Sequence, residues 1–203
     1  MIVLGITGNI GMGKSTVSRM FEELGAVRID ADAVVSGLLG DPEVIREVSD
    51  LFGEHVLHNG VLDRKLLAHT VFSNSRLRLG LENILHPRVF KAVDAQVEEL
   101  AKTAAPLIIV VEAPVLFERS YQNRFDSVLT VFTSEETALR RLEEKGMTRD
   151  DARKRIESQF PITMKREKAD MTIDNNGTHD ETREQVRRIY ELLMLLEKQH
   201  GCN

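Results

Sequence analysis

The sequence of 203 residues is poor in cysteine, tryptophan and long apolar runs. Cys202, close to the C-terminus, is its only cysteine, so neither an intrachain disulfide nor a cluster of thiolate ligands can form. This shortage is typical of the reducing cytosol. The first apolar run, residues 2–4, breaks at Gly5, and no run has the length of a membrane span. We therefore expect a cytoplasmic protein with no signal peptide and no membrane partner.

The sequence also has no excess of positive charge. A formal net charge of -5 disfavours a general affinity for polyanions, so nucleic acid is not expected as a main partner. Apolar residues make up 42% and charged residues 29%, which is enough to cover a globular core. The length suits one core better than two independent domains, so we predict a single domain over residues 1–203.

Short apolar runs rich in β-branched residues alternate with longer amphipathic stretches. Continuous apolar runs of this kind are typical of strands buried on both faces of a parallel sheet. The predicted fold class is therefore α/β, with a parallel sheet of about five strands flanked by helices. The predicted strands are Ile2–Ile6, Val27–Ile29, Leu107–Val111, Val128–Phe132 and Met171–Ile173.

Residues 31–103 have a helical pattern throughout and no convincing strand. The stretch is far longer than a β-to-β crossover needs, so it predicts an inserted helical subdomain. Helix boundaries elsewhere are predicted from capping signals. These signals are Gly25, Thr148-x-x-Asp151 and Thr178-x-x-Glu181, the last opening a helix to about Gln199.

The segment Gly8–Ser15 has the spacing G-x-x-x-x-G-K-[ST] between a predicted strand and a predicted helix. Glycines in such a loop let backbone N–H groups turn toward a phosphate, Lys14 neutralises the β and γ oxygens, and the Ser15 hydroxyl binds magnesium. A dinucleotide fingerprint is excluded, because Thr16 stands where the third glycine would be needed. We expect ATP and Mg²⁺ as ligands. The loop residues expected to bind ATP are Gly8, Asn9, Ile10, Gly11, Met12, Gly13, Lys14, Ser15 and Thr16.

A guanine-reading Asn-Lys-x-Asp motif does not occur in the sequence. Asp50-Leu-Phe-Gly53 matches the loose D-x-x-G pattern of GTPases, but it ends a predicted helix and follows no strand. A GTPase is therefore not expected.

Acidic residues follow two of the predicted strands. Asp30 and Asp32 lie where ligands bind in open α/β sheets, so they could orient magnesium and accept a proton, although one of them could simply cap the next helix. Glu112 stands where a Walker B acid reaches the water shell of the metal. Glu118 is either a further site acid or an ordinary loop or helix-start acid.

A run of basic residues falls in a stretch, residues 146–168, that we predict to be a small helical lid. The run is either a solvated helix face or part of a lid that closes over the triphosphate and excludes water. Its members are Arg149, Arg153, Lys154, Arg155, Lys165, Arg166 and Lys168.

Together these motifs resemble the dephospho-CoA kinase family, which is similar to the nucleoside monophosphate kinases. The resemblance runs along the whole chain, and Met12, Ser36 and Val115 depart from the residues common in the family. The matching segments are Ile6-Thr7-Gly8-Asn9-Ile10-Gly11-Met12-Gly13-Lys14-Ser15-Thr16, Asp30-Ala31-Asp32, Gly60-Val61-Leu62-Asp63-Arg64, Leu85-His86-Pro87-Arg88-Val89, Glu112-Ala113-Pro114-Val115-Leu116-Phe117-Glu118, Arg141-Leu142, Arg155-Ile156-x-x-Gln159 and Ala169-Asp170-x-x-Ile173-Asp174-Asn175-Asn176-Gly177.

The resemblance implies ATP-dependent phosphorylation of the ribose 3′-hydroxyl of dephospho-CoA, the last step of coenzyme A synthesis. It implies that Asp32 is the general base toward that hydroxyl. The expected catalytic residues are therefore Asp32 and Arg141, with Lys14 from the phosphate-loop motif. The resemblance also implies that Arg141 and the segment around Arg155 and Gln159 contact ATP or close the lid.

The same resemblance assigns the helical insertion to the acceptor, with Arg64 and His86 as binding residues. Without it, both residues would be interpreted as structural. We place Glu112 on the acceptor side as well. At the metal we expect Ser15 to bind directly through its hydroxyl and Glu112 to act through water. The alternatives are a nucleoside monophosphate kinase of the same fold and a nucleotide-dependent switch.

Overall fold

The structure is a computed structural model that describes residues 1–102 and 108–200. Thr103, Leu107 and Cys202, which enter the expectations above, lie outside the described residues. The chain divides into two compact units. The first comprises residues 1–30 and the chain from Leu100 onward, and the second comprises residues 31–99.

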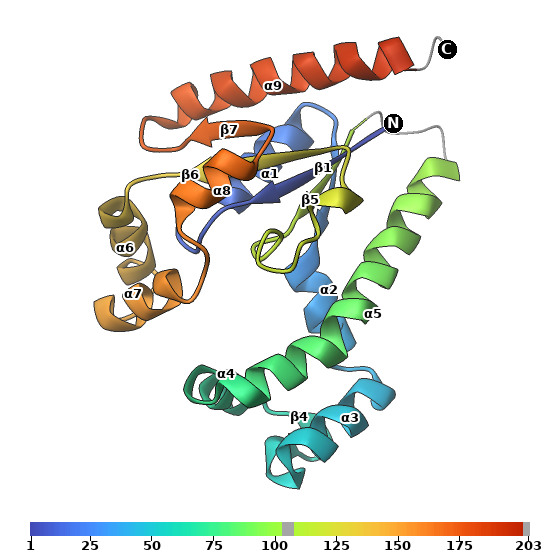
Figure 1. Ribbon diagram of the computed structural model, residues 1–203, viewed down its shortest axis with the longest axis vertical. Coiled ribbons are helices and arrows are strands. Elements are labelled where there is room, and N and C mark those ends of the chain that lie inside the picture. Colours follow the sequence, from blue (N-terminus) through green and yellow to red (C-terminus); the bar gives the residue numbers. More distant parts are fainter. Residues whose placement is uncertain (103–107, 201–203) are drawn as a thin grey trace. The chain divides into compact units, whose positions relative to one another are not determined.

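The first unit is built on a five-stranded parallel sheet with the strand order β2-β5-β1-β6-β7 (Figure 1). The strands are β1 (Ile2–Thr7), β2 (Val27–Asp30), β5 (Ile108–Glu112), β6 (Ser127–Phe132) and β7 (Met171–Asp174). All five predicted strands form, and the α/β class is confirmed. The phosphate loop follows the central strand β1.

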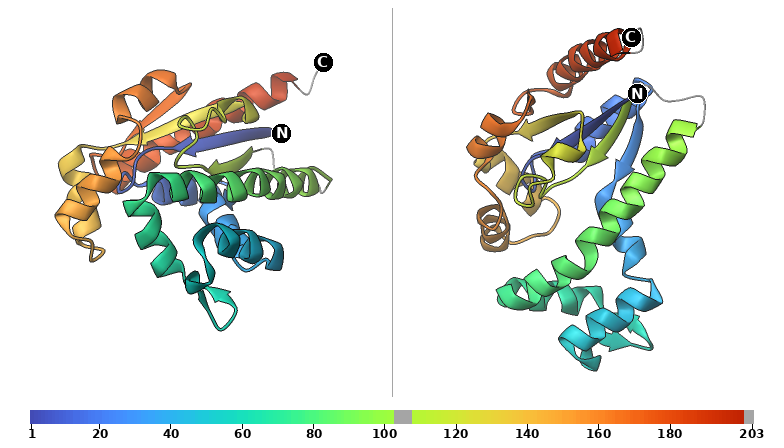
Figure 2. Two further views of the ribbon diagram at one scale, coloured as in Figure 1. Left: turned by 60° about the horizontal axis from the view of Figure 1, so that its bottom comes forward. Right: turned by 45° about the vertical axis from the view of Figure 1, so that its right-hand side comes forward.

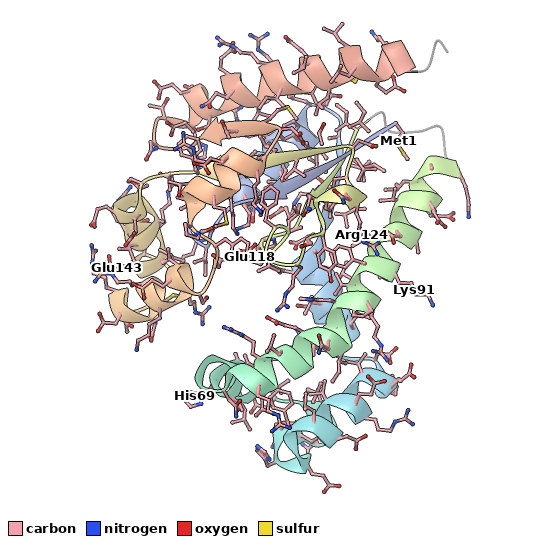
Figure 3. All side chains as sticks on the ribbon, viewed as in Figure 1. Met1, His69, Lys91, Glu118, Arg124 and Glu143 are labelled. Atoms are coloured by element: carbon pink, nitrogen blue, oxygen red, sulfur yellow. The ribbon has the colours of Figure 1, made fainter. Side chains whose placement is uncertain are left out.

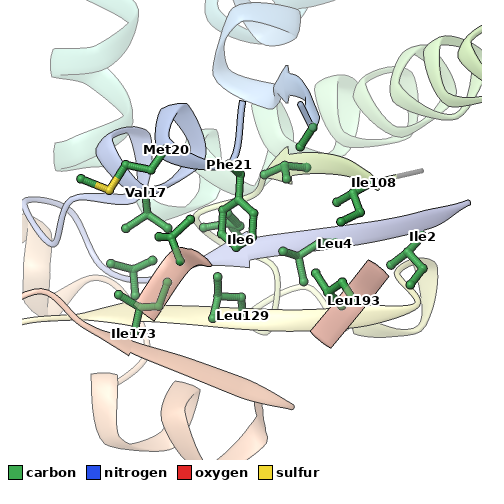
Figure 4. Close-up of a cluster of buried hydrophobic side chains, with 14 residues drawn as sticks. Ile2, Leu4, Ile6, Val17, Met20, Phe21, Ile108, Leu129, Ile173 and Leu193 are labelled. Atoms are coloured by element: carbon green, nitrogen blue, oxygen red, sulfur yellow. The ribbon is translucent and has the colours of Figure 1, made fainter. Parts of the chain in front are cut away.

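Two helices, α1 (Lys14–Glu23) and α9 (His179–His200), cover one face of this sheet. Figure 4 shows their apolar side chains meeting those of the strands, with Phe21 of α1 and Leu193 of α9 close to Leu4 of β1. The predicted capping box opens α9, since Thr178 N–H donates to Glu181 Oε2 and Glu181 N–H donates back to Thr178 Oγ1. These contacts bury the centre of the sheet on this side.

The opposite face is covered by the segment after β5 and by α8 (Ile162–Lys168). Leu116 and Phe117 of that segment are buried, with Phe125 packed against them. A Cβ at Gly5 would come within 3 Å of Phe125 and Leu116, so glycine is needed for this close packing. The remaining elements of the unit are α6 (Glu135–Glu143), α7 (Arg149–Glu157) and η2 (Gln122–Arg124).

The second unit contains the predicted helices around its own apolar core, which includes Val44, Val48 and Leu67. Its longest helix is α5, which is seen along its length in the right-hand view of Figure 2. The last three residues of α5 belong to the first unit. Its elements are α2 (Ala31–Leu38), α3 (Pro42–Phe52), η1 (Glu54–Val56), β3 (Leu57–His58), β4 (Val61–Leu62), α4 (Arg64–Ser73) and α5 (Ser75–Lys102).

The expectation that residues 31–103 contain no strand is wrong at the β3–β4 hairpin. Its turn residues Asn59 and Gly60 both have positive φ, 51° and 78°, as a two-residue hairpin turn requires. Two-residue strands are too short to show an alternating pattern, whereas the Asn-Gly pair is a recognisable signal. Elsewhere, no helix in the described parts of the chain combines the length and apolar character of a membrane span.

Candidate active site

The backbone of the phosphate loop, Gly8–Gly13, takes conformations that need glycine. Gly11 and Gly13 have φ of 80° and 96°, in the left-handed region. A Cβ at Gly11 would lie 2.7 Å from the Ala138 carbonyl oxygen, and one at Gly13 would collide with Nδ2 of Asn175. The loop is therefore enclosed by α6 and by the turn after β7, and side chains are excluded at both positions.

The ammonium of Lys14 lies against this loop. Its Nζ donates to the carbonyls of Gly8 at 3.0 Å and Asn9 at 3.2 Å. The first turn of α1 begins here, because the N–H of Thr16 donates to the Gly13 carbonyl at 3.1 Å. A cation and the N-terminus of a helix thus share one loop, an arrangement that suits a phosphate.

Glu112, at the end of β5, is buried and bound by three side chains. Ser15 Oγ donates to Oε2 at 2.9 Å, Ser18 Oγ donates to Oε1, and Arg28 Nε donates to Oε1 at 2.7 Å. Burial raises the pKa of Glu112, but these hydrogen bonds and the charge of Arg28 outweigh it, so the pKa falls below its ordinary value. The carboxylate is therefore ionised and fixed beside the phosphate loop.

Arg28, on the neighbouring strand β2, is a residue of this site that sequence reasoning missed. Its Nη2 also donates to Asp30 Oδ2 at 3.0 Å. Residues two apart on a strand point to the same face, so the spacing of Arg28 and Asp30 on β2 was the available signal.

Arg141 reaches the loop from α6. Its Nη2 donates to the carbonyl of Asn175 at 3.1 Å, whereas its Nη1 is buried and has no hydrogen-bond partner among the described residues. Burial lowers the pKa of the guanidinium, and the charge of Arg140 lowers it further. Buried donors normally have partners, so Nη1 is the group that an anionic ligand at this loop would satisfy.

Asn175 connects this arginine to the phosphate loop and to α9, a role that sequence reasoning did not assign. Its Nδ2 donates to the Met12 carbonyl at 2.9 Å, its Oδ1 accepts from Thr182 Oγ1 at 3.0 Å, and its N–H donates to the Phe132 carbonyl at 2.8 Å. The side chain is buried with both polar atoms satisfied. Asn175 therefore fixes the position of the loop backbone at Met12.

The start of the phosphate loop is bound to the segment that joins α7 and α8. Asn9 Nδ2 donates to the Phe160 carbonyl at 3.1 Å, and the N–H of Ile10 donates to Gln159 Oε1 at 2.8 Å. The N–H of Phe160 donates in turn to Glu118 Oε1 at 3.0 Å. The predicted lid segment thus contacts the loop through Gln159 and Phe160.

A buried ion pair supports this contact. The side chain of Lys165 is fully buried, and its Nζ lies 2.7 Å from Glu118 Oε1 and donates to the Pro114 carbonyl at 2.8 Å. Burial lowers the pKa of Lys165, and the carboxylate of Glu118 opposes that shift. Figure 3 labels Glu118 in the loop after β5. Its carboxylate is engaged with the lid segment and not with Ser15.

Other members of the basic run also have structural partners. Arg149 pairs with Glu136 and Glu143 of α6, and the guanidinium of Arg166 lies 3.8 Å from the centroid of the Phe132 ring. The run is therefore not a uniformly solvated face. Arg155 lies half-buried on α7.

Three predicted site residues belong to the second unit. Asp32 lies in the first turn of α2. Arg64 opens α4, and its Nη2 donates to the carbonyl of Ser36 at 2.7 Å. His86 lies in α5, where burial lowers its pKa.

The oxygen donors at the phosphate loop fit magnesium. Within residues 1–102 and 108–200, no group of three or more His, Cys, Asp and Glu side chains could hold a metal ion. Ser15 and Glu112 instead provide a hydroxyl and a carboxylate side by side. Magnesium is commonly bound in this way, by one or two protein oxygens together with water and substrate phosphates.

Comparison with known proteins gives consistent matches. A family model described as dephospho-CoA kinase matches residues 2–181. A curated dephospho-CoA kinase from Geobacillus kaustophilus is 39% identical over 200 residues, which cover 97% of this chain and 99% of that protein. A solved structure from Thermus thermophilus has 34% identity and a TM-score of 0.80, covering 93% of this chain and 95% of its own. A solved dephospho-CoA kinase from Campylobacter jejuni has 28% identity and a TM-score of 0.68, with the same coverage.

Proposed function

The chain belongs to the dephospho-CoA kinase family, and from this premise we propose how its residues transfer the γ-phosphoryl group of ATP to the ribose 3′-hydroxyl of dephospho-CoA, giving coenzyme A and ADP. The proposed activity rests on the family match over residues 2–181, which includes the phosphate loop and the acids Asp32 and Glu112.

The phosphate loop and two cations hold the triphosphate in this proposal. Backbone N–H groups of the loop, other than those of Ile10, Met12 and Thr16, which donate within the protein, bind the phosphate oxygens. Lys14 and Arg141 neutralise the charge that moves during transfer. The buried Nη1 of Arg141, which has no hydrogen-bond partner in the part of the chain that the structure describes, supports this role of Arg141. Arg155 joins them from the lid, residues 146–168.

Ser15 and Glu112 hold magnesium, Ser15 by its hydroxyl and Glu112 through water. When bound, the ion neutralises phosphate oxygens. The hydrogen bond between the two side chains supports this assignment, since it places both oxygens at one point of the loop.

Asp32 is the general base of the proposal. Its carboxylate accepts the proton of the 3′-hydroxyl while the new bond from that oxygen to the γ-phosphorus forms and the bond to the ADP oxygen breaks. Arg64 and His86, with Glu112, bind the acceptor, so the insertion over residues 31–103 is the acceptor subdomain. The lowered pKa of His86 supports a neutral imidazole that can donate one hydrogen bond and accept another.

A coupled assay for ADP release tests the activity. We expect ADP in the presence of ATP, magnesium and dephospho-CoA, and very little when the acceptor is left out. If ATP gives ADP only when a nucleoside monophosphate replaces dephospho-CoA, the protein is a nucleotide kinase. ADP release from ATP that does not depend on any acceptor would favour a switch. A cytoplasmic location, where ATP is used, belongs to the same proposal.

A further inference from the structure

Arg28 has no role in the scheme above, yet its guanidinium bridges two acids at the edge of the phosphate loop. Nε donates to Glu112 at 2.7 Å and Nη2 donates to Asp30 at 3.0 Å. The side chain of Glu112 is 7% exposed and that of Arg28 is 22% exposed, so their contact is largely shielded from solvent. Arg28 is thus a fixed cation at a site where a metal cation is expected.

The register of the sheet explains why a cation is needed there. Asp30 and Glu112 are paired across β2 and β5, and Arg28 lies on the same face two residues before Asp30. Neighbouring strands are about 4.8 Å apart, so two carboxylates in register repel each other. The guanidinium of Arg28 binds Glu112 through Nε and Asp30 through Nη2, and its positive charge reduces that repulsion.

Both carboxylate oxygens of Glu112 already accept hydrogen bonds from protein donors. Oε1 accepts from Ser18 and Arg28, and Oε2 accepts from Ser15. A guanidinium has no lone pair for a metal, and its charge repels one. While Arg28 holds Glu112 and Asp30, a divalent cation must displace it or be drawn in by additional negative charge.

We propose that Arg28 is a built-in counter-ion that takes the place of a divalent cation at Glu112 and Asp30, so that the metal binds together with the nucleotide phosphates and not before them. The inference rests on the metal role proposed above for Glu112. Arg28 is a positioning residue here, because it acts through the two carboxylates.

The test is a titration of the folded protein with Mn²⁺, followed by electron paramagnetic resonance, without nucleotide and with ADP. In the nucleotide-free protein, Arg28→Met should bind Mn²⁺ at least about tenfold more tightly than wild type, because one nearby positive charge is lost. Arg28→Lys keeps the charge and should stay within about threefold of wild type. Arg28→Gln provides a second neutral variant in case Arg28→Met does not fold.

Arg187→Met is a matched control. Arg187 also bridges two acids, Glu184 and Glu191, but on the exposed surface of α9. Its loss should leave Mn²⁺ binding unchanged. The gain in Mn²⁺ affinity expected for Arg28→Met should disappear in the double variant that also carries Glu112→Gln.

Equal Mn²⁺ affinities in wild type and the neutral Arg28 variants would overturn the inference, and so would a gain of the same size in Arg187→Met. The metal role proposed for Glu112 is tested separately by Glu112→Gln. If Glu112→Gln leaves Mn²⁺ affinity unchanged even with ADP, Glu112 is not at the metal. If it weakens that affinity while the neutral Arg28 variants bind like wild type, only the role of Arg28 is wrong.

Discussion

The carbonyl of Asn175 accepts a hydrogen bond from Nη2 of Arg141, while Nη1 of the same guanidinium is buried and makes none with residues 1–102 and 108–200. One arm of the arginine is therefore fixed by the protein, and the other carries an unsatisfied donor next to the phosphate loop. Such a group is costly in the free protein and becomes favourable when an anion binds. This links stability and ligand binding at one residue.

Arg141→Met should therefore weaken catalysis without weakening the fold. We expect kcat/KM for ATP to fall about a hundredfold or more, as for the loss of a donor to transition-state charge. The melting temperature should stay close to that of wild type, since the loss of the hydrogen bond to the Asn175 carbonyl is offset by removal of the buried Nη1 donor. Arg140→Met is the control, because Arg140 is exposed and pairs only with Glu144 among the ion pairs observed in the described residues. A variant with normal kcat/KM would contradict the role of Arg141.

Asn175→Asp tests whether this side chain fixes the phosphate loop. The substitution keeps the shape but turns the donor to the Met12 carbonyl into an acceptor. The free energy of unfolding should fall by about 1–3 kcal/mol. Affinity should be lost more for ATP than for AMP, because the loop binds the phosphate chain. Thr182→Val removes only the donor to Oδ1 and serves as comparison. An equal loss for ATP and AMP in calorimetry would argue against action through the loop.

The Lys165 and Glu118 pair should behave as a unit. Lys165→Met leaves a buried carboxylate without its counter-ion and should cost about 3–5 kcal/mol of stability in denaturant unfolding. Glu118→Gln keeps the acceptor for the Phe160 N–H. The double variant should be destabilised by less than the sum of the single variants. Strict additivity would show that the two charges do not support each other.

The pH dependence of stability follows from the lowered pKa of Lys165. The unfolded chain keeps the lysine proton up to its ordinary pKa of 10.5, whereas the folded protein releases it at lower pH. Between these two values unfolding takes up a proton, so stability should rise with pH in that range. Lys165→Met should lack this rise in unfolding experiments at a series of pH values. The same slope in both proteins would mean that Lys165 is not its source.

Asp32→Asn tests the general base. Turnover should fall by about a hundredfold to ten-thousandfold, while the Kd of ATP stays close to that of wild type. The expected pattern is a change in kcat with ATP binding preserved, measured by steady-state kinetics and calorimetry. Near-normal turnover would remove Asp32 from this role.

The parallel sheet could be predicted because its strands are continuous apolar runs, and β1 and β5 are buried along nearly their whole length. The phosphate loop could be predicted because its chemistry requires fixed spacing within eight residues. Capping at Thr148 and Thr178 is equally local, since each side chain bonds to a group three residues away.

Contacts between distant segments could not be predicted in the same way. Arg28 meets Glu112 across 84 residues, and Asn175 meets Met12 across 163. Neither pair leaves a pattern in one sequence, because its geometry is set by the packing of whole elements. Lys165 illustrates the same limit, since a lysine in a basic run is usually exposed and this one is fully buried.

Identification of the phosphorylated product tests the central claim most directly. ³¹P NMR of a reaction with ATP, magnesium and dephospho-CoA should show one new phosphomonoester on the ribose 3′-oxygen for each ADP formed. A phosphate on any other position, or ADP formed without a phosphorylated acceptor, would contradict the account.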